Sequence, residues 1–357
     1  MKKIKARVEY EIVETIAEGG MGTVLKAREK GIEDFEKIVA IKKLLPKFSK
    51  DRRFVQMFVK EAKMVANLVH ENIVQIYQLN KTRREYYIAM EYVDGIPLHQ
   101  MILFHDKTNQ RFPVNLAVFI ASRVARGLVY AHNRRDSNGI PLDIVHCDIC
   151  PHNVLINTEG VAKITDFGIA RARSASELDM AFAGKVLFMS PEQAAQKKLD
   201  FRSDIYSLGM LLFFVLSGKS GREGSDSIKE VVANAMANKI KWEYLPQDLD
   251  EDLLNILHKM LATEPDERYP NTAELAQDLE YYIYKNGYGP TIVTLADYLR
   301  DQMPGLFGLD LGNALLPDTG DYTLVLDEFK DLKPKEEPKS EPAKKSLLRK
   351  TVGRWIK

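Results

Sequence analysis

The spacing of hydrophobic residues differs between the first part of the chain and the rest. Up to about residue 93, short runs rich in β-branched and aromatic residues alternate with glycines or charged residues, and this pattern predicts strands. The predicted strands are residues 10–16, 23–28, 38–43, 73–79 and 86–92. Among them, residues 54–68 place apolar side chains three and four positions apart, which predicts one amphipathic helix.

Beyond Pro97 the spacing is mainly helical. The predicted helices are residues 114–132, 203–216, 227–238, 251–261 and 272–285. The longest apolar run, residues 208–216, is too short to cross a bilayer and predicts a buried helix. A β-rich part followed by a helical part predicts an α+β fold of two lobes with a cleft between them. We place a small lobe with one major helix at residues 10–93 and a large helical lobe at residues 94–286.

Composition then narrows the class of protein. The chain has 357 residues, of which 45% are hydrophobic, enough for a large buried core. Its 51 basic and 50 acidic residues leave a net charge of +1, which predicts no nucleic-acid partner. Two cysteines are too few for a disulfide framework, and the basic N-terminal extension, residues 1–9, leads into no apolar run typical of a signal peptide. We therefore expect a cytoplasmic protein.

The composition changes after Gly287. Residues 287–332, a C-terminal extension, mix glycine, aspartate and leucine. Residues 333–357 begin as a linker rich in proline, lysine and glutamate, which predicts disorder, and end in a tail, residues 344–357, with basic and apolar but no acidic side chains. Two interpretations of the tail stay open: a basic amphipathic helix in weak contact with a membrane surface or a partner, and a solvated terminus.

A glycine-rich turn lies between the first two predicted strands. In Ala17-Glu-Gly-Gly-Met-Gly-Thr-Val24, the glycines allow backbone amides to approach phosphate oxygens without interference from a Cβ atom. A glycine-rich hairpin is more often only a turn, so this motif alone does not predict nucleotide binding.

Lys42 ends the strand-like sequence Val39-Ala-Ile-Lys42. An ammonium group in an apolar run needs a counter-ion, because an unpaired buried charge is costly. Glu61 on the next predicted helix can provide it, and Lys42 can then hold the α- and β-phosphates of a nucleotide. Alternatively, Lys42 is a surface residue at a strand end and Glu61 belongs to a solvated helix face.

Two aspartates and an asparagine follow in a suggestive order. Asp148 and Asn153 stand five residues apart, and thirteen residues after Asn153 comes Asp166 in the sequence Asp-Phe-Gly168. One carboxylate can orient an attacking hydroxyl. The asparagine oxygen and the second carboxylate can coordinate Mg²⁺, which prefers oxygen ligands.

Taken in order, these motifs resemble the signature set of the eukaryotic-like protein kinases, over about residues 10–285. Met189-Ser-Pro-Glu192, residues 203–209 and Arg268 add to the resemblance, and the glycine loop and Ser-Pro-Glu-Gln are similar to those of bacterial Ser/Thr kinases. The resemblance implies a bilobal kinase fold, ATP and Mg²⁺ as cofactors, and transfer of the γ-phosphate to serine or threonine of a protein substrate. It implies nothing about the oligomeric state.

The resemblance also implies roles for matching residues. Asp148 is the catalytic base, Asn153 and Asp166 hold magnesium, and Lys42 binds phosphates while Glu61 anchors it. Residues expected around the nucleotide are Ala17, Gly19, Gly22, Val24, Ala40, Met90, Glu91, Val93 and Leu155, with Met90 as gatekeeper and residues 91–93 as hinge. Two structural contacts are implied as well: packing of His146 and Phe167 with Val65, and an ion pair of Glu192 with Arg268.

The loop that carries Asp148 departs from the family pattern. Cys147 replaces the arginine that pairs with an activation-loop phosphate in the family, so we expect activity without phosphorylation of Ser174 or Ser176. Cys150 replaces the lysine that neutralises the γ-phosphate, and Lys185 stands where the family has threonine. One hypothesis is that Lys185 returns the missing cation to the catalytic site; the alternative is that it points to solvent.

Other interpretations remain for these departures. His146, Cys147, Cys150 and His152 also have the spacing of metal ligands, which allows a zinc site or a redox switch. Ala17, where the family has glycine, together with the two cysteines, favours a pseudokinase that binds ATP and signals by conformation. The complete set of Lys42, Glu61, Asp148, Asn153 and Asp166 favours an active Ser/Thr kinase. Cys150 matches neither Ser/Thr nor Tyr kinases. A weaker alternative is an adaptor that the tail recruits to a membrane.

Overall fold

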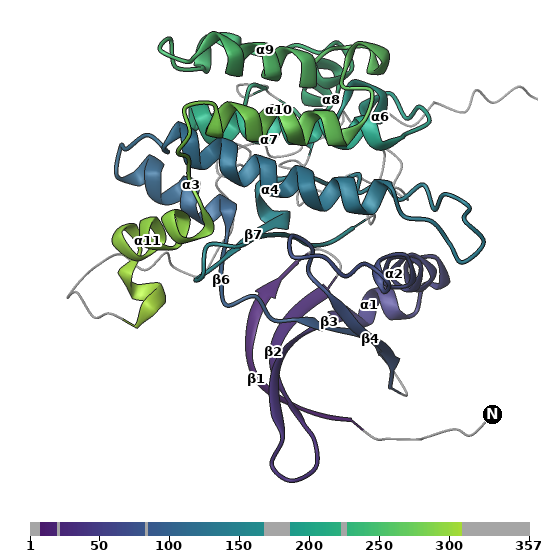
Figure 1. Ribbon diagram of the computed structural model, residues 1–357. Coiled ribbons are helices and arrows are strands. Elements are labelled where there is room, and N and C mark those ends of the chain that lie inside the picture. The colour runs from purple at the N-terminus through teal and green to yellow at the C-terminus, as the bar shows by residue number, and fades with distance from the viewer. Residues whose placement is uncertain (1–7, 20–21, 83–84, 168–185, 223–226, 309–357) are drawn as a thin grey trace, which may run out of the picture.

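The computed structural model describes residues 8–19, 22–82, 85–167, 186–222 and 227–308, without the side chains of Lys47 and Glu61. Figure 1 shows a β-sheet lobe at the bottom of the view and a larger helical lobe above it. The predicted α+β fold of two lobes is confirmed.

The small lobe is one antiparallel sheet with a helix packed against it. The strand order is β1-β2-β3-β5-β4. The strands are β1 (Glu9–Glu18), β2 (Gly22–Lys30), β3 (Glu36–Leu44), β4 (Ile76–Lys81) and β5 (Tyr86–Glu91). After a single turn, α1 (Pro46–Ser49), the major helix α2 (Arg52–Val65) begins where the Asp51 side chain accepts a 2.8 Å hydrogen bond from the Arg53 backbone. Phe58 and Ala62 of α2 are buried against Leu44 and Ile88 of the sheet, which forms the core of this lobe.

One strand differs from its predicted bounds. The strand predicted at residues 73–79 begins only at Ile76, because Ile73 forms a bridge with Ile164 of the large lobe and the Val74 backbone donates a 2.9 Å hydrogen bond to the Ile164 carbonyl. This stretch therefore joins the lobes before the chain enters β4.

The large lobe is built mainly of helices around α7. The helices are α3 (Leu98–Lys107), α4 (Val114–His132), α6 (Pro191–Ala194), α7 (Phe201–Ser217), α8 (Ile228–Met236), α9 (Glu251–Met260), α10 (Thr272–Tyr284) and α11 (Ile292–Gln302). Short 3-10 turns are η1 (Pro151–Asn153), η5 (Trp242–Tyr244), η6 (Pro265–Glu267) and η7 (Pro304–Phe307). A small antiparallel sheet faces the other lobe, with β6 (Gly95–Pro97), β7 (Val154–Asn157) and β8 (Ala162–Ile164) in that order.

Helix α7 is buried over most of its length, as predicted for the apolar run 208–216. It begins at Asp200, whose side chain accepts a 2.8 Å hydrogen bond from the Arg202 backbone, and ends at Gly218 with a left-handed φ of 70°. In the described part of the chain, α4 is the one helix long and apolar enough to cross a membrane; most of it is buried in contact with α7 and α10, as in the core helix of a globular domain.

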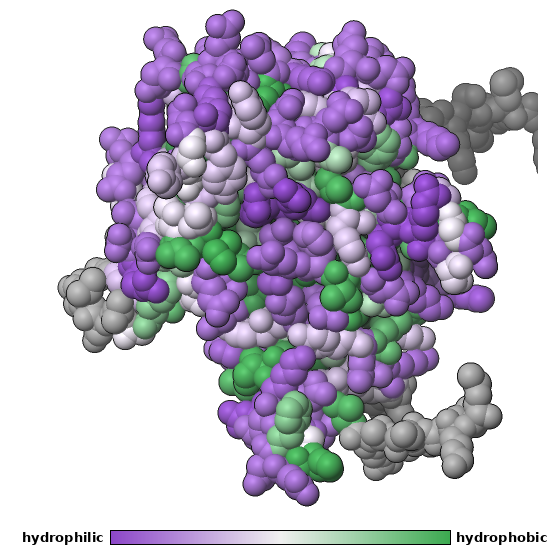
Figure 2. All heavy atoms as spheres, viewed as in Figure 1, coloured by the Kyte–Doolittle hydropathy of each residue, from purple (hydrophilic) through white to green (hydrophobic). Residues whose placement is uncertain are grey.

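Besides the four-residue helices α1 and α6, two longer helices have no counterpart among the predictions. Helix α3 buries the polar residues His99, Gln100 and His105, which breaks the hydrophobic spacing that identifies a helix. Helix α11 lies beyond Gly287 and packs on the large lobe through buried Leu295 and Leu299. The surface in Figure 2 is mostly hydrophilic, with small separate hydrophobic areas.

Candidate active site

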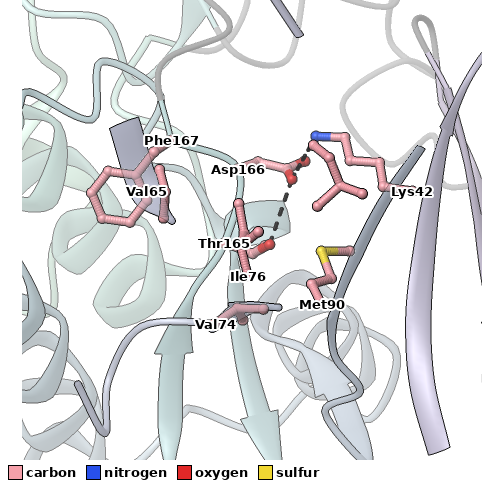
Figure 3. Close-up of a pocket in the computed structure, with 9 residues that line it drawn as sticks. Lys42, Val65, Val74, Ile76, Met90, Thr165, Asp166 and Phe167 are labelled. Atoms are coloured by element: carbon pink, nitrogen blue, oxygen red, sulfur yellow. Dashed lines mark hydrogen bonds and ion pairs between the residues drawn. The ribbon is translucent and has the colours of Figure 1, made fainter. Parts of the chain in front are cut away.

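A lysine of the small lobe meets an aspartate of the large lobe between the two lobes. The Lys42 Nζ atom, on β3, lies 2.7 Å from Oδ1 of Asp166, which follows β8 (Figure 3). Lys42 is only 7% exposed, so its charge needs this partner. The predicted pair of Lys42 with Glu61 falls on a side chain outside the described part, and Asp166 is the partner that sequence reasoning did not foresee for Lys42.

An apolar cavity adjoins this ion pair. Figure 3 shows that residues of both lobes surround it, with Met90 near Lys42 and Val65 beside Phe167. The lining residues are Lys42, Val65, Val74, Ile76, Ile88, Met90, Thr165, Asp166 and Phe167. Met90 was predicted to border the nucleotide, whereas Val74, Ile76 and Ile88 were not, because their spacing marks them only as strand residues.

The predicted nucleotide-binding residues converge from four parts of the chain. Ala40 and Met90, opposite each other on β3 and β5, are buried in the core of the small lobe. Val24 from β2, Val93 after β5 and Leu155 from β7 pack against that same cluster. Residues far apart in the sequence thus form one apolar surface between the lobes, of the kind that accepts a flat aromatic ring.

The β1–β2 hairpin carries the predicted phosphate loop. Ala17 lies opposite Val24 in the hairpin, and the Gly19 backbone donates a 2.9 Å hydrogen bond to the Gly22 carbonyl. A Cβ atom at residue 22 would lie 2.5 Å from the carbonyl oxygen of Lys43, so only glycine allows this approach. Residues 20–21 of the loop lie outside the described part.

Glu91 makes a contact that sequence reasoning missed. Its carboxylate lies 2.9 Å from Nζ of Lys163 on β8, and Lys163 also donates a 2.8 Å hydrogen bond to the Glu71 carbonyl. The Glu91 side chain is therefore engaged with the large lobe, and its backbone N–H donates a 2.8 Å hydrogen bond to the Gln75 carbonyl. No motif in the sequence marks Lys163 as its partner.

Asp148 and Asn153 lie together on the loop between α4 and β7. The Asn153 amide donates 2.8 Å hydrogen bonds to both the backbone carbonyl and the Oδ2 atom of Asp148. The Asn153 carbonyl accepts a 2.9 Å hydrogen bond from the Thr165 backbone, next to Asp166. The two loops that carry the predicted base and the predicted metal ligands are thus joined directly.

His146 organises the same loop from within. Its Nδ1 atom accepts a 3.1 Å hydrogen bond from the Asp148 backbone, and its Nε2 atom donates a 3.0 Å bond to the Thr165 carbonyl. Both bonds require a neutral ring, and burial lowers the pKa of His146 in the same sense. The ring lies 4.4 Å from that of Phe167, centroid to centroid, so the predicted contact between these two rings is confirmed.

The predicted pair of Glu192 and Arg268 is also confirmed. The Arg268 guanidinium donates two hydrogen bonds, of 2.8 and 2.9 Å, to the two carboxylate oxygens, and the Ser203 hydroxyl donates a third, of 2.7 Å. Burial acts to raise the pKa of Glu192, but these partners outweigh it and lower the pKa to about 2. The pair fixes α6 against the start of α7.

The two cysteines are buried and form no disulfide. Both ring nitrogens of His146 are engaged within the loop, whereas the ring of His152 stacks on His99 at 4.1 Å. Within the described part of the chain, no three His, Cys, Asp or Glu side chains are placed to hold a metal ion. The zinc interpretation therefore gains no support. Lys185, Ser174 and Ser176 lie outside the described residues.

Magnesium fits the oxygens that this site presents. Both hydrogen bonds to Asp148 come from the Asn153 amide nitrogen, so neither of them uses the amide oxygen, which is the proposed ligand. The Asp166 carboxylate, the second proposed ligand, lies on the adjoining loop. Mg²⁺ keeps several waters and binds through one or two protein ligands together with substrate phosphates, so a larger protein cluster is not required.

Comparisons with known proteins agree with this geometry. The protein kinase domain family matches residues 10–281. A tyrosine-protein kinase of Myxococcus xanthus, MasK, is 34% identical over 293 residues, which are 82% of this chain and 45% of MasK. The Bacillus subtilis serine/threonine-protein kinase PrkC is 34% identical over 281 residues, 78% of this chain and 41% of PrkC. This chain thus spans less than half the length of either relative.

A solved structure gives the same result for the fold. The crystal structure of the Mycobacterium tuberculosis PknI kinase domain superposes with a TM-score of 0.54 and 25% sequence identity, over 76% of this chain and 94% of that domain. Family match, relatives and fold coincide over the residues that form both lobes and the site between them. The chain belongs to the protein kinase family.

Proposed function

We propose that this protein transfers the γ-phosphate of ATP to serine and threonine hydroxyls of proteins, with Mg²⁺ as the metal ion. One observation carries the proposal: the loop of Asp166, the partner of Lys42, is joined to the loop of the Asp148–Asn153 pair by the hydrogen bond from the Thr165 backbone to the Asn153 carbonyl. A scaffold that only bound ATP would have no need for a carboxylate held in this way beside the metal-binding residues.

In this proposal each polar group has one task. Asp148, oriented by the Asn153 amide, positions the substrate hydroxyl and accepts its proton. Lys42, whose Nζ atom lies 2.7 Å from Asp166, holds the α- and β-phosphates. Asn153 and Asp166 are the ligands of Mg²⁺, which when bound neutralises charge on the phosphates.

The nucleotide would lie on the apolar surface between the lobes. Val24, Ala40 and Leu155 provide the faces on which the adenine packs, and Met90 closes the inner end. The backbone of residues 91–93 offers hydrogen bonds to the adenine edge. The Gly19 and Gly22 backbone lies over the phosphates, and Glu61 supports Lys42.

The missing cation at Cys150 needs a substitute. The Cys150 side chain is 1% exposed and carries no positive charge. We propose that Lys185 supplies the ammonium group that neutralises the transferred phosphate. Likewise, the buried Cys147 offers no positive charge to an activation-loop phosphate, so activity does not require phosphorylation of that segment.

The hydroxyl class is a further part of the proposal. The names of the relatives include both serine/threonine- and tyrosine-protein kinases. We favour serine and threonine because the glycine loop and the Ser-Pro-Glu-Gln sequence resemble the former class. The protein acts in the cytoplasm, and the tail at residues 344–357 provides a weak contact with a membrane surface or partner protein.

We place the catalytic unit at residues 10–286 together with α11. Residues 10–93 form the small lobe and residues 94–286 the large one, and α11 is the part of the extension 287–332 that packs on the large lobe through Leu295 and Leu299. Residues 1–9 and 333–357 are peripheral to catalysis.

Radiolabelled ATP tests the proposed function. The protein is incubated with γ-³²P-ATP, Mg²⁺ and a general protein substrate such as casein, and the labelled protein is hydrolysed to identify the phosphorylated amino acids. We expect labelled phosphoserine and phosphothreonine. ATP binding without transfer would instead support the pseudokinase, and phosphotyrosine alone would overturn the hydroxyl class.

A further inference from the structure

Helix α11 packs against the turn that joins β7 and β8. Gly160 in this turn is buried and has a left-handed φ of 81°. A Cβ atom at this position would lie 1.9 Å from the Ile292 carbonyl oxygen and 2.8 Å from the Ala296 backbone nitrogen, both in α11. The turn and the helix thus meet backbone to backbone, at a distance that only glycine permits.

The same turn also contacts the chain just after the proposed hinge. The Thr158 backbone N–H donates a 2.8 Å hydrogen bond to the Asp94 carbonyl. The next residue, Gly95 on β6, packs so closely on β7 that a Cβ atom there would lie 2.0 Å from the Ile156 carbonyl oxygen. This second contact again joins backbone to backbone. Strand β7 carries Leu155 as well, which packs in the apolar cluster proposed to receive the adenine.

Two backbone contacts in series transmit a displacement without absorbing it. A long side chain can change its rotamer when a neighbour moves, whereas closely packed backbone groups cannot. The turn between them is itself stiff, because the Asn157 side-chain oxygen accepts hydrogen bonds of 3.1 Å from the Glu159 backbone and 2.7 Å from the Val161 backbone. A shift of α11 therefore passes to the turn and from the turn to the residues after the hinge.

Contacts on its other side hold α11 in place. The helix lies beside α3 (Figure 1), where the Tyr298 hydroxyl is 2.9 Å from Nε2 of His105 and the Tyr298 ring also contacts Phe112. Leu295 and Leu299 are buried in the large lobe. The helix lies beyond the residues that match the protein kinase family, 10–281, so the family pattern assigns it no role.

We propose that α11 is a positioning element for nucleotide binding: it braces the β7–β8 turn, and through this turn it holds Asp94 and Gly95 where the hinge can bind the adenine. The inference rests on the proposed function for the place of the nucleotide. It assigns α11 an effect on ATP affinity and none on the transfer step, because the Asp148 loop is held separately, by the His146 ring and the Asn153 amide.

A matched pair of glycine variants isolates the contact with α11. Gly160→Ala places a methyl group against the helix and also imposes a side chain on a left-handed residue. Gly139→Ala imposes the same backbone strain, since Gly139 has a φ of 80°, but a Cβ atom there would meet nothing within 4 Å in the described part of the chain. A second pair acts from the other side: Leu295→Ala loosens the helix, and Val293→Ala changes an exposed residue of the same helix.

The experiment measures nucleotide affinity and turnover on the whole chain. Calorimetric titration with Mg²⁺ and AMP-PNP, a non-hydrolysable analogue of ATP, gives Kd; casein phosphorylation at varied ATP gives KM for ATP and kcat. We expect Gly160→Ala to raise Kd and KM about tenfold, because small displacements of binding groups are costly, while kcat stays within about twofold. Gly139→Ala should stay within about twofold of wild type in all three. A merely structural effect would reduce the amount of folded protein, which lowers kcat and the number of binding sites but leaves Kd and KM unchanged.

Other results would overturn the inference. Equal Kd values for Gly160→Ala and Gly139→Ala, or a lower kcat with unchanged KM, would show that α11 only stabilises the lobe. Should Gly160→Ala fail to fold, Leu295→Ala decides: a Kd at least about fivefold above that of Val293→Ala supports the brace, and an equal Kd contradicts it. The titration requires no phosphotransfer. A wild-type protein that binds AMP-PNP but labels no casein would therefore contradict the proposed function, while the Kd values still decide the role of α11.

Discussion

The carboxylate of Asp204 on α7 holds the backbone of Cys147 in a left-handed conformation. The Cys147 backbone N–H donates a 2.8 Å hydrogen bond to Asp204, and the φ angle of Cys147 is 64°. Non-glycine residues adopt this region at a cost, which persists only where surrounding contacts enforce it. The His146 backbone N–H donates a second hydrogen bond, of 2.7 Å, to Oδ2 of Asp204, and Nε2 of His132 lies 2.8 Å from the same oxygen. The most deeply buried helix of the large lobe thus determines the path of the loop that carries Asp148.

Asp204→Asn should misplace this loop. An asparagine has a single acceptor oxygen, so it cannot accept all three hydrogen bonds. We expect a loss of about 1–3 kcal/mol in the free energy of unfolding, and a phosphotransfer rate lower by about tenfold or more. Chemical denaturation and initial rates measure the two effects. The control is Asp297→Asn, the same change at an exposed residue paired with Arg300 on α11; equal behaviour of the two variants would contradict the role of Asp204.

The pair of Glu192 and Arg268 should make stability depend on acid. With the pKa of Glu192 lowered from 4.5 to about 2 in the folded state, its contribution is complete above the unfolded value and is lost as the pH falls from 4.5 towards 2. Glu192→Gln should cost up to about 3 kcal/mol at pH 7, and the difference from wild type should shrink below pH 4. Denaturant unfolding at pH 7 and pH 3 measures this. A difference that stays constant with pH would contradict the lowered pKa.

Lys185→Ala should impair catalysis without affecting ATP binding. If Lys185 supplies the cation that the buried Cys150 cannot, its loss should lower the rate of phosphotransfer about 100-fold. The affinity for ATP, measured by calorimetry, should stay within about twofold because Lys42 still binds the phosphates. Lys198→Ala, which removes an exposed lysine of the large lobe, is the matched control.

A second variant near Lys185 tests the role of the segment that precedes it. Ser174→Ala combined with Ser176→Ala should leave the rate unchanged, since Cys147 offers no positive charge to a phosphate there. Normal turnover in Lys185→Ala would contradict the compensation hypothesis, and a large loss in the double serine variant would contradict independence from phosphorylation.

Helix α11 should contribute to the stability of the large lobe. A Cβ atom at Gly160, in the turn between β7 and β8, would lie 1.9 Å from the Ile292 carbonyl, and the Tyr298 hydroxyl lies 2.9 Å from Nε2 of His105. Leu295→Ala should therefore cost about 2–5 kcal/mol, as for other buried leucines. Val293→Ala, at a position on the same helix that is 62% exposed, should cost less than about 0.5 kcal/mol. Equal thermal unfolding of the two variants would show that α11 does not pack on the lobe.

The sequence predicts regular, amphipathic elements well and contacts between distant loops poorly. The helix expected at residues 114–132 matches α4, because its apolar residues follow helical spacing throughout. Helix α3 escaped prediction because it buries His99 and His105, and the early part of the strand at residues 73–79 was drawn into a bridge with Ile164. Hydrophobic spacing predicts neither the burial of the two histidines nor the bridge between Ile73 and Ile164.

In the site, too, the sequence predicts some residues and misses others. Ordered motifs identified Lys42, Asp148, Asn153 and Asp166, since their chemistry requires particular residue types at particular spacings. Lys163 stands in no motif and could not be found in this way. Its contact with Glu91 depends on how the two lobes meet, which is a property of the folded chain alone.

The central claim is that Asp148 serves as the base of an active protein kinase. The most direct measurement is the initial rate of transfer from γ-³²P-ATP to casein for wild type, Asp148→Asn and the exposed control Asp248→Asn, with ATP affinity measured in parallel. We predict that Asp148→Asn lowers the rate at least about 100-fold with ATP binding retained, while Asp248→Asn behaves as wild type. An Asp148→Asn protein that transfers phosphate as fast as wild type would contradict the account.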